Sequence, residues 1–406
     1  MAEQTIHIET ALMPMFYKDF HCIMGACQDD CCDDGWRIEF NKKDYLAIKR
    51  AAEKAGLEEE VSQGMRRLRE REHDGYYAEF VVNAKGRCAF HTSEGLCRLQ
   101  LQCGPEVLPK VCQKFPRRKE YSPMGFEFSL SPACEGVLAL LWDLPQGIDF
   151  LEEPLPRKDW RNSIPSSPAA ARFAEIRSLC IDTLQERALR LPQRMLLMGV
   201  MLQGLRAADW EAEGALDRWL EHSAAMLADP SAASAALDRL TGQPEMCLCE
   251  NLRVLLGISS GSRRELVSEL CAAINADWKE ERIDHFTINL GHYRELEAKL
   301  EELLGHSEYF FENLMVSIMF YEGFPRVDLP DNMWESYVGL CSLYSFYRFA
   351  AICGCDKEVS RERLFHVIVQ ASRALLHNRA GQAEIRKELF QNDSATLAHM
   401  AILLNG

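Results

Sequence analysis

Apolar positions recur at helical spacing along most of the chain after residue 167. They repeat every three or four residues, which is the period of an α-helix with one buried face. Ser167 and Pro168 have the composition of a helix start, because serine caps free backbone N–H groups and proline fits the first turn. The pattern therefore predicts helices over residues 168–187, 192–208, 214–227, 245–256, 262–276, 293–304, 307–321, 331–352, 360–377 and 382–391.

The first 142 residues have shorter and more varied patterns. Residues 42–72 are rich in helix formers but contain Gly56 and Gly64, which predicts helices interrupted near these glycines. Asn83–Gly86 has the composition of a hairpin turn after a strand. The other predicted elements are an extended lead-in over 1–20, strands at 35–40, 76–82 and 127–130, and helices near 96–102, near 106–114 and ending at 142.

A proline-rich segment separates these two patterns. Between Asp143 and Pro168 the chain has five prolines and little periodicity, which is typical of a linker. We therefore predict a cysteine-rich domain over residues 1–145, a Pro-rich linker over 146–168 and an all-helical domain over 169–406. The predicted fold class is mainly α, with a small cysteine-rich α+β module followed by an all-α domain. We predict that the all-α domain is irregular, because no repeat of fixed period is present in it.

Cysteine is the residue type whose distribution adds most to this picture. Nine of the 16 cysteines precede residue 135, and the other seven are scattered, as buried core thiols are. The N-terminus lacks the pattern of a signal peptide, so we expect a cytoplasmic protein with reduced thiols. The net charge of −15 argues against a nucleic-acid partner, and the apolar stretches are too short to cross a membrane.

A first group of cysteines lies near the N-terminus. Its members are Cys22, Cys27, Cys31 and Cys32. Thiolates at this spacing, with glycines nearby for tight turns, suit a zinc ion or an iron–sulfur cluster. In a helical turn Cys27 and Cys31 project from the same face, whereas adjacent cysteines cannot easily bind one ion in the same way. We predict that this group binds the metal cofactor.

A second group of cysteines comes from separate short elements. Its members are Cys88, Cys97, Cys112 and Cys134. We predict that these elements meet at one point and that all eight cysteines are metal ligands. Eight thiols suffice for one four-ligand cluster with a structural zinc, for two clusters, or for one cluster with some thiols unused. Cys103 ranks below them because its surroundings are rich in amides, and His91 is expected to be structural.

Several motifs accompany these cysteines. They are Arg87-Cys88-Ala-Phe, Gly95-Leu96-Cys97-Arg-Leu-Gln, Cys112-Gln-Lys-Phe-Pro116-Arg117, Ser129-Leu-Ser-Pro-Ala-Cys134 and Glu312-Asn313-Leu-Met-Val with Phe324-Pro325. In combination they resemble the flagellin lysine-N-methylases, and the cysteine part is similar to CxxCxxCC-type zinc- or iron-chelating domains. In the family the Ser-Leu segment is often followed directly by Cys-Pro. In this sequence it is followed by Ser-Pro-Ala-Cys134, so the family pattern does not assign a role to Cys134.

The resemblance implies a bacterial cytoplasmic enzyme that transfers methyl groups from S-adenosylmethionine to lysine ε-amines of flagellin. It also implies a [4Fe–4S] cluster, with zinc as the alternative metal. The Cys-x3-Cys-x2-Cys pattern of radical enzymes is absent, because Asp34 stands at the third position. No GxGxxG follows a predicted strand, so a nucleotide-binding methyltransferase fold is not expected. The catalytic residues stay unassigned.

Two other functional classes fit the same residues. The first is a zinc-stabilised protein-interaction module without enzymatic activity, which the absence of a recognisable donor site favours. The second is an electron-transfer or cluster-carrier protein, which needs no substrate pocket. The surplus of cysteines over the four that one zinc needs favours the methyltransferase.

Overall fold

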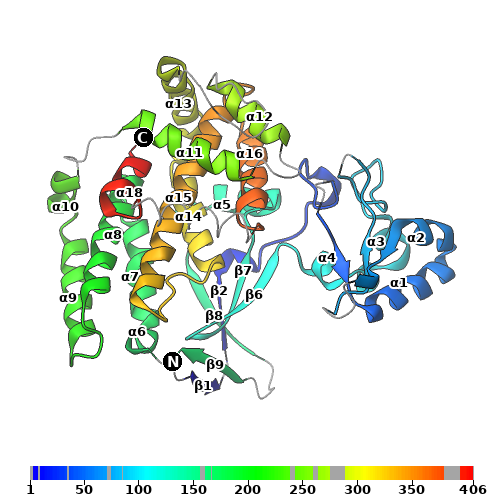
Figure 1. The fold of residues 1–406 in the computed structure, drawn as a ribbon, viewed down its shortest axis with the longest axis horizontal. Helices are drawn as coiled ribbons and strands as arrows, with labels where there is room; N and C mark the ends of the chain where they lie inside the picture. Colours follow the sequence, from blue (N-terminus) through cyan, green and yellow to red (C-terminus); the bar gives the residue numbers. More distant parts are fainter. Residues whose placement is uncertain are drawn as a thin grey trace. The chain divides into compact units, whose positions relative to one another are not determined.

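The protein folds into two compact units. The structure is a computed structural model that describes residues 3–7, 10–33, 36–70, 75–84, 86–155, 161–165, 167–237, 243–258, 264–274, 289–378 and 394–405. The helical unit comprises residues 1–19, 119–133 and 138–406, and the cysteine-rich unit comprises 20–118 and 134–137. The predicted fold class, mainly α, is confirmed (Figure 1).

The helical unit is organised around the long helix α15, Pro330–Gly354. This helix packs against α8, α16, α18 and α13, and also contacts α14. Trp334, Tyr337, Phe346 and Tyr347 are among the largest fully buried side chains. Because α15 has neighbours on several sides, it is apolar around most of its circumference rather than along one stripe.

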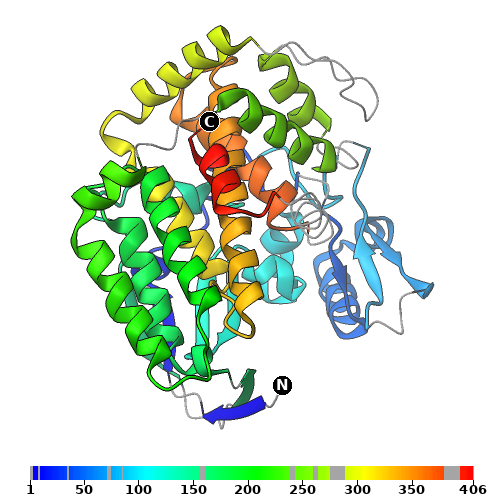
Figure 2. The ribbon, with the colours of Figure 1, turned by 60° about the vertical axis from the view of Figure 1, so that its left-hand side comes forward.

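The other helices pack on α15 or on one another, and Figure 2 shows α7, α8 and α9 side by side. They are α5 (Glu135–Trp142), α6 (Pro168–Ala171), α7 (Phe173–Gln185), α8 (Leu191–Ala207), α9 (Ala215–Ala228), α10 (Pro230–Leu237), α11 (Pro244–Ile258), α12 (Arg264–Ala273), α13 (Leu290–Leu304), α14 (Tyr309–Tyr321), α16 (Arg361–Leu375) and α18 (Leu397–Leu404). The side chain of Ser167 accepts a hydrogen bond from Ala170 N at 3.0 Å, so the predicted N-cap is confirmed.

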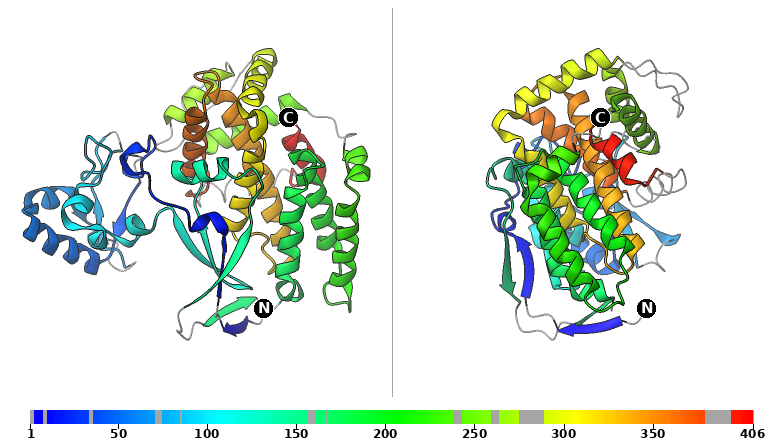
Figure 3. Two further views of the ribbon diagram at one scale, coloured as in Figure 1. Left: turned by 180° about the vertical axis from the view of Figure 1, so that it is seen from behind. Right: turned by 90° about the vertical axis from the view of Figure 1, so that its left-hand side faces the viewer.

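A four-stranded sheet also belongs to the helical unit (Figure 3). Its order is β6 (Arg117–Ser122), β7 (Gly125–Leu130), β2 (Thr10–Pro14) and β8 (Phe150–Pro154). Strand β2 is parallel to β7 and antiparallel to β8. Glu127 of β7 forms an ion pair of 2.5 Å with Arg177 of α7, and both side chains are buried. This ion pair joins the sheet to the helices.

The cysteine-rich unit has a smaller sheet with helices packed on it. Its strands are β3 (Glu39–Phe40), β5 (Ala78–Phe80) and β4 (Met65–Arg67), in that order and antiparallel. Its helices are α1 (Lys42–Ala55), α2 (Glu58–Gly64), α3 (Arg98–Cys103) and α4 (Lys110–Lys114). Gly56 ends α1 with a left-handed backbone, φ 71°, so the predicted interruption there is confirmed.

The regions predicted as a lead-in and a linker contain strands. Within 146–168, β8 pairs with β2, and β9 (Arg161–Pro165) pairs with β1 (Glu3–His7). Residues 1–19 and 119–133 therefore belong to the helical unit, because strands from both segments join one sheet. The helix predicted over 382–391 lies outside the described residues. In the described part of the chain, no helix combines the length and apolar character needed to cross a bilayer.

Candidate metal centre

Five cysteine side chains line one cavity in the cysteine-rich unit. The cavity has a volume of about 80 Å³, and the five are Cys31, Cys32, Cys88, Cys97 and Cys112. They come from three short segments: the turn at residues 30–33, the hairpin before α3, and α4. Cys88, Cys97 and Cys112 of the second group therefore lie together at this cavity, whereas Cys134 does not line it.

The rest of the cavity wall is largely apolar. It includes Trp36, Phe80, Phe90, Leu108 and Phe115. The rings of Trp36 and Phe115 meet edge to face with centroids 4.9 Å apart. Phe90 and Leu108 also belong to the buried core of the unit. Such a wall limits the access of water to the partly buried thiols, while Cys31 is exposed, and it strengthens their interaction with any charge bound among them.

The surroundings hold these thiols in their neutral form. Burial raises the pKa of Cys88 to about 11 and also raises the pKa values of Cys97 and Cys112. A hydrogen bond with Cys31, together with burial, raises the pKa of Cys32. Several thiolates can exist together in such a site only when a cation compensates their charge. The arrangement therefore has the chemistry of a metal-binding site.

Backbone contacts join the segments that carry the thiols. Cys88 N donates a hydrogen bond to Cys32 O at 2.8 Å, which connects the N-terminal turn to the hairpin. A Cβ atom at Gly25 would lie 2.5 Å from Glu94 O. Only glycine permits this close approach of two backbones. The glycine that the sequence suggested for a tight turn thus serves the packing of one cysteine segment against another.

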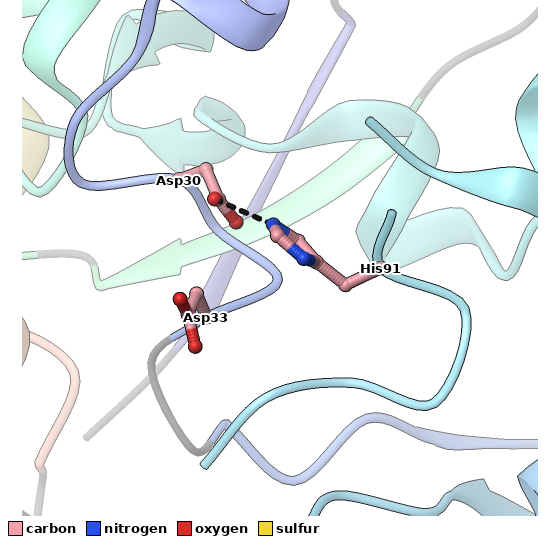
Figure 4. A group of neighbouring side chains, drawn as sticks. All are labelled: Asp30, Asp33 and His91. Carbon is pink, nitrogen blue, oxygen red and sulfur yellow. Dashed lines mark hydrogen bonds and ion pairs between the residues drawn. The ribbon is translucent and has the colours of Figure 1, made fainter. Parts of the chain in front are cut away.

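Asp30, Asp33 and His91 form a polar group beside the turn at Cys32 (Figure 4). Asp30 Oδ2 lies 2.8 Å from His91 Nε2, and Asp30 Oδ1 accepts a hydrogen bond from Cys32 N at 2.8 Å. One ligand atom of each residue in the group lies within 4.8 Å of the others. Arg87 Nη2 donates to Asp33 Oδ2 at 2.5 Å and supplies positive charge. The group orients the turn that presents Cys32.

Three more thiols, those of Cys22, Cys27 and Cys134, lie outside the cavity lining but close to Cys31, whose charge acts on Cys134. Cys134 is close enough to Cys22 and Cys27 for their charges to interact. Glu135 Oε2 lies 3.4 Å from Cys27 Sγ and accepts a hydrogen bond from Gln28 N at 2.7 Å. Burial, followed by the charge of Glu135, raises the pKa of Cys27, and burial raises the pKa of Cys134 to about 11. Glu135 is a positioning residue that the sequence analysis missed, although it directly follows Cys134.

The eight predicted cysteines therefore form two adjacent groups that Cys31 connects. The four N-terminal cysteines do not stay together: Cys31 and Cys32 line the cavity, whereas Cys22 and Cys27 lie near Cys134. Cys103 packs against the core of the unit outside the cavity lining. Cys31 and Cys32 lie in a turn in which Asp33 N donates a hydrogen bond to Asp30 O at 3.3 Å.

In the helical unit, the motif Glu312-Asn313 lies buried in α14. Glu312 forms ion pairs with Arg194 at 2.5 Å and with Arg187 at 2.8 Å. Asn313 Nδ2 donates hydrogen bonds to Leu141 O at 2.9 Å and Leu144 O at 2.8 Å. These contacts connect α14 to the end of α5, to the segments that follow α5 and α7, and to α8, so the motif serves the packing of the helices.

The fold and this site define a mainly helical protein that carries a thiol-rich candidate metal centre. The sequence family described as "FliB lysine N-methylase C-terminal domain" matches residues 177–403, which is more than half of the chain. The chain belongs to this family, and the resemblance found in its motifs is thereby confirmed. The matched region includes α14 and α15 but not the cysteine-rich unit.

Individual relatives agree with this assignment. A lysine-N-methylase of Salmonella choleraesuis is 27% identical over 171 residues, which is 41% of this chain and 41% of that protein. The lysine-N-methylase of Salmonella typhimurium is 26% identical over the same share. The flagellar biosynthetic protein FliU of Salmonella muenchen is 29% identical over 36% of this chain and 83% of that protein. The chain thus matches less than half the length of these lysine-N-methylases, and no solved structure matches it.

Proposed function

We propose that this protein is an S-adenosylmethionine-dependent protein-lysine N-methyltransferase that modifies lysine ε-amines of flagellin. Its membership of a lysine N-methylase family carries the proposal. The flagellar name of one relative supports a flagellar substrate. The reaction needs a lysine ε-amine that has lost its proton, because the ammonium form has no lone pair for attack. We further propose that the chain acts in the cytoplasm.

We also propose that the cavity thiols hold a [4Fe–4S] cluster. Four thiolates bind such a cluster, and five thiols line the cavity. The surplus of cysteines in this unit over the four that one zinc ion needs favours an iron–sulfur cluster over a single zinc ion.

The chain's own residues have defined roles in this proposal. Cys88, Cys97 and Cys112, with Cys31 or Cys32, supply the ligands, and the apolar wall limits the access of water. A bound cluster with four cysteine ligands would supply redox chemistry toward the sulfonium donor. Cys22, Cys27 and Cys134 stay a predicted second metal site.

Anaerobic purification followed by iron, sulfide and zinc analysis tests the metal. We expect about four irons and four sulfides per chain, with a visible absorption band that dithionite bleaches. Cys112→Ser should lower the iron content, whereas Cys103→Ser, outside the cavity lining, should leave it unchanged. Equal iron loss in both variants contradicts the ligand assignment.

An assay with flagellin and methyl-labelled S-adenosylmethionine tests the activity. Mass spectrometry should find methyl groups on flagellin lysines, and none when the donor is omitted. A protein that holds one zinc per chain and transfers no methyl group would support the interaction module. That alternative is favoured by the packing of Cys88, Cys97 and Cys112 against the core of the unit, since metal binding there would be coupled to folding.

A further inference from the structure

The helical unit has a cavity of its own, with a volume of about 100 Å³. It lies between α14 and α15, with residues from the C-terminal parts of α11 and α16 also at its wall. Met319, Phe324, Leu343 and Leu375 are among the side chains that make this wall mostly apolar. The cavity lies entirely within the region that matches the lysine N-methylase family.

At Gly339 of α15, no side chain separates the cavity from the backbone of the helix. A Cβ atom built at Gly339 would have no other atom within 4 Å. The open space therefore continues to the backbone of the helix. Glycine in the middle of a helix lowers its stability relative to alanine. The open space at Gly339 is therefore accompanied by a less stable helix.

Two glutamates, one arginine and two serines give the cavity its polar atoms. Glu322 and Glu335 both line it, and Glu335 is half-buried. Among the described residues, Glu335 has no hydrogen-bond or ion-pair partner. Arg326 also lines the cavity, but its guanidinium lies 3.6 Å from Asp328. The site thus offers a carboxylate to a ligand with positive charge.

We propose that this cavity binds the side chain of the substrate lysine, an inference that rests on the proposed function. The four methylene groups of lysine match the apolar wall, and its ε-ammonium matches the carboxylate of Glu335. The cavity is smaller than the roughly 300–1,000 Å³ that enclose a drug-sized ligand. The size therefore favours a slender side chain over the nucleoside of the methyl donor.

Ligand-observed NMR titration of the full chain with Nα-acetyl-lysine methylamide tests this site. The counterpart with norleucine, which lacks the amine, should bind more weakly. Glu335→Gln should weaken binding of the lysine amide about fivefold, as expected for a partly exposed ion pair. Gly339→Met should abolish the binding by filling the cavity, whereas Gly339→Ala and the exposed Glu358→Gln should retain it. Circular dichroism melting shows whether each variant is folded.

The results separate this inference from the proposed function. Equal binding of the two amides, absent binding by the wild-type chain, or unchanged binding by both Glu335→Gln and Gly339→Met overturns the cavity assignment. The cavity assignment is also overturned if Glu335→Gln and Gly339→Met both methylate flagellin with the wild-type KM. The proposed function would then still stand. A chain that binds lysine as expected but methylates no flagellin refutes the function and leaves the lysine site standing.

Discussion

The carboxylate of Glu312 lies 2.5 Å from Nη1 of Arg194, in the interior of the helical unit. Only 2% of the Glu312 side chain and 9% of the Arg194 side chain are exposed. Both charged groups are therefore shielded from water, and each one stabilises the charge of the other. Arg194 also donates hydrogen bonds to Leu184 O and Leu189 O, so the pair connects α14 to the chain between α7 and α8.

Removing the charge of Glu312 should strongly destabilise the helical unit. Glu312→Gln leaves the buried Arg194 without its partner, a change that costs about 3–5 kcal/mol in other buried pairs. Asp331→Asn, which breaks the exposed pair with Arg206, should cost about 0–1 kcal/mol. Urea denaturation of the two variants measures the difference. Equal losses in both variants would contradict the burial of the Glu312 pair.

Two glycines in neighbouring helices should respond to alanine with opposite signs. A Cβ atom at Gly199 of α8 would lie 2.1 Å from the Tyr337 hydroxyl oxygen, so Gly199→Ala should cost about 1–3 kcal/mol by overpacking. Gly339→Ala meets no atom within 4 Å and should stabilise α15 by about 0.5–1 kcal/mol. Thermal melting should therefore give a lower Tm for Gly199→Ala and a higher Tm for Gly339→Ala. A lower Tm for both would refute the open space at Gly339.

The stability of the cysteine-rich unit should depend on the ionisation of Glu79. Burial acts to raise the pKa of Glu79, but hydrogen bonds from Arg37 and Arg66 outweigh it, and the pKa lies below the ordinary 4.5. A lowered pKa contributes stability that is complete above the unfolded-state pKa and is lost as the pH falls through the folded-state pKa.

A pH series tests this linkage. Between neutral pH and acidic pH, the wild-type chain should lose more unfolding free energy than Glu79→Gln, because the variant has no such proton to bind. Glu59→Gln, on the exposed side of α2, is the control and should follow the wild type. Urea denaturation at each pH, with equal metal content in all three proteins, measures the effect. Parallel curves for wild type and Glu79→Gln would exclude it.

The reactivity of Cys27 should depend on Glu135. Burial and then the negative charge of Glu135 raise the pKa of the Cys27 thiol, which keeps it protonated at neutral pH. Glu135→Gln removes the charge, so the thiolate fraction of Cys27 should increase. In metal-free protein, iodoacetamide should then label Cys27 faster, as peptide mapping by mass spectrometry can measure. Labelling of Cys112, in the other thiol group, should not change; faster labelling of both would indicate general unfolding instead.

Local sequence determined most of the helical part of this protein. Periodic apolar residues and end signals such as Ser167-Pro168 act within a few turns of one helix, so they are readable without knowledge of the fold. The cysteine motifs likewise contain the thiols that line the cavity, and they were noticeable in the sequence because metal ligands are limited to a few residue types.

The tertiary structure alone decided how distant segments meet. Strand β2 joins β7 and β8 although more than 100 residues separate them, and no local pattern encodes such pairing. The division of the N-terminal cysteines also depends on distant segments, because Cys27 lies beside Cys134 and Glu135, which follow it by more than 100 residues. The cavity beside Glu335 exists only because α14 and α15 pack with Gly339 facing open space. Helix formation is a local property, whereas a site built from several segments depends on packing between residues far apart in the chain.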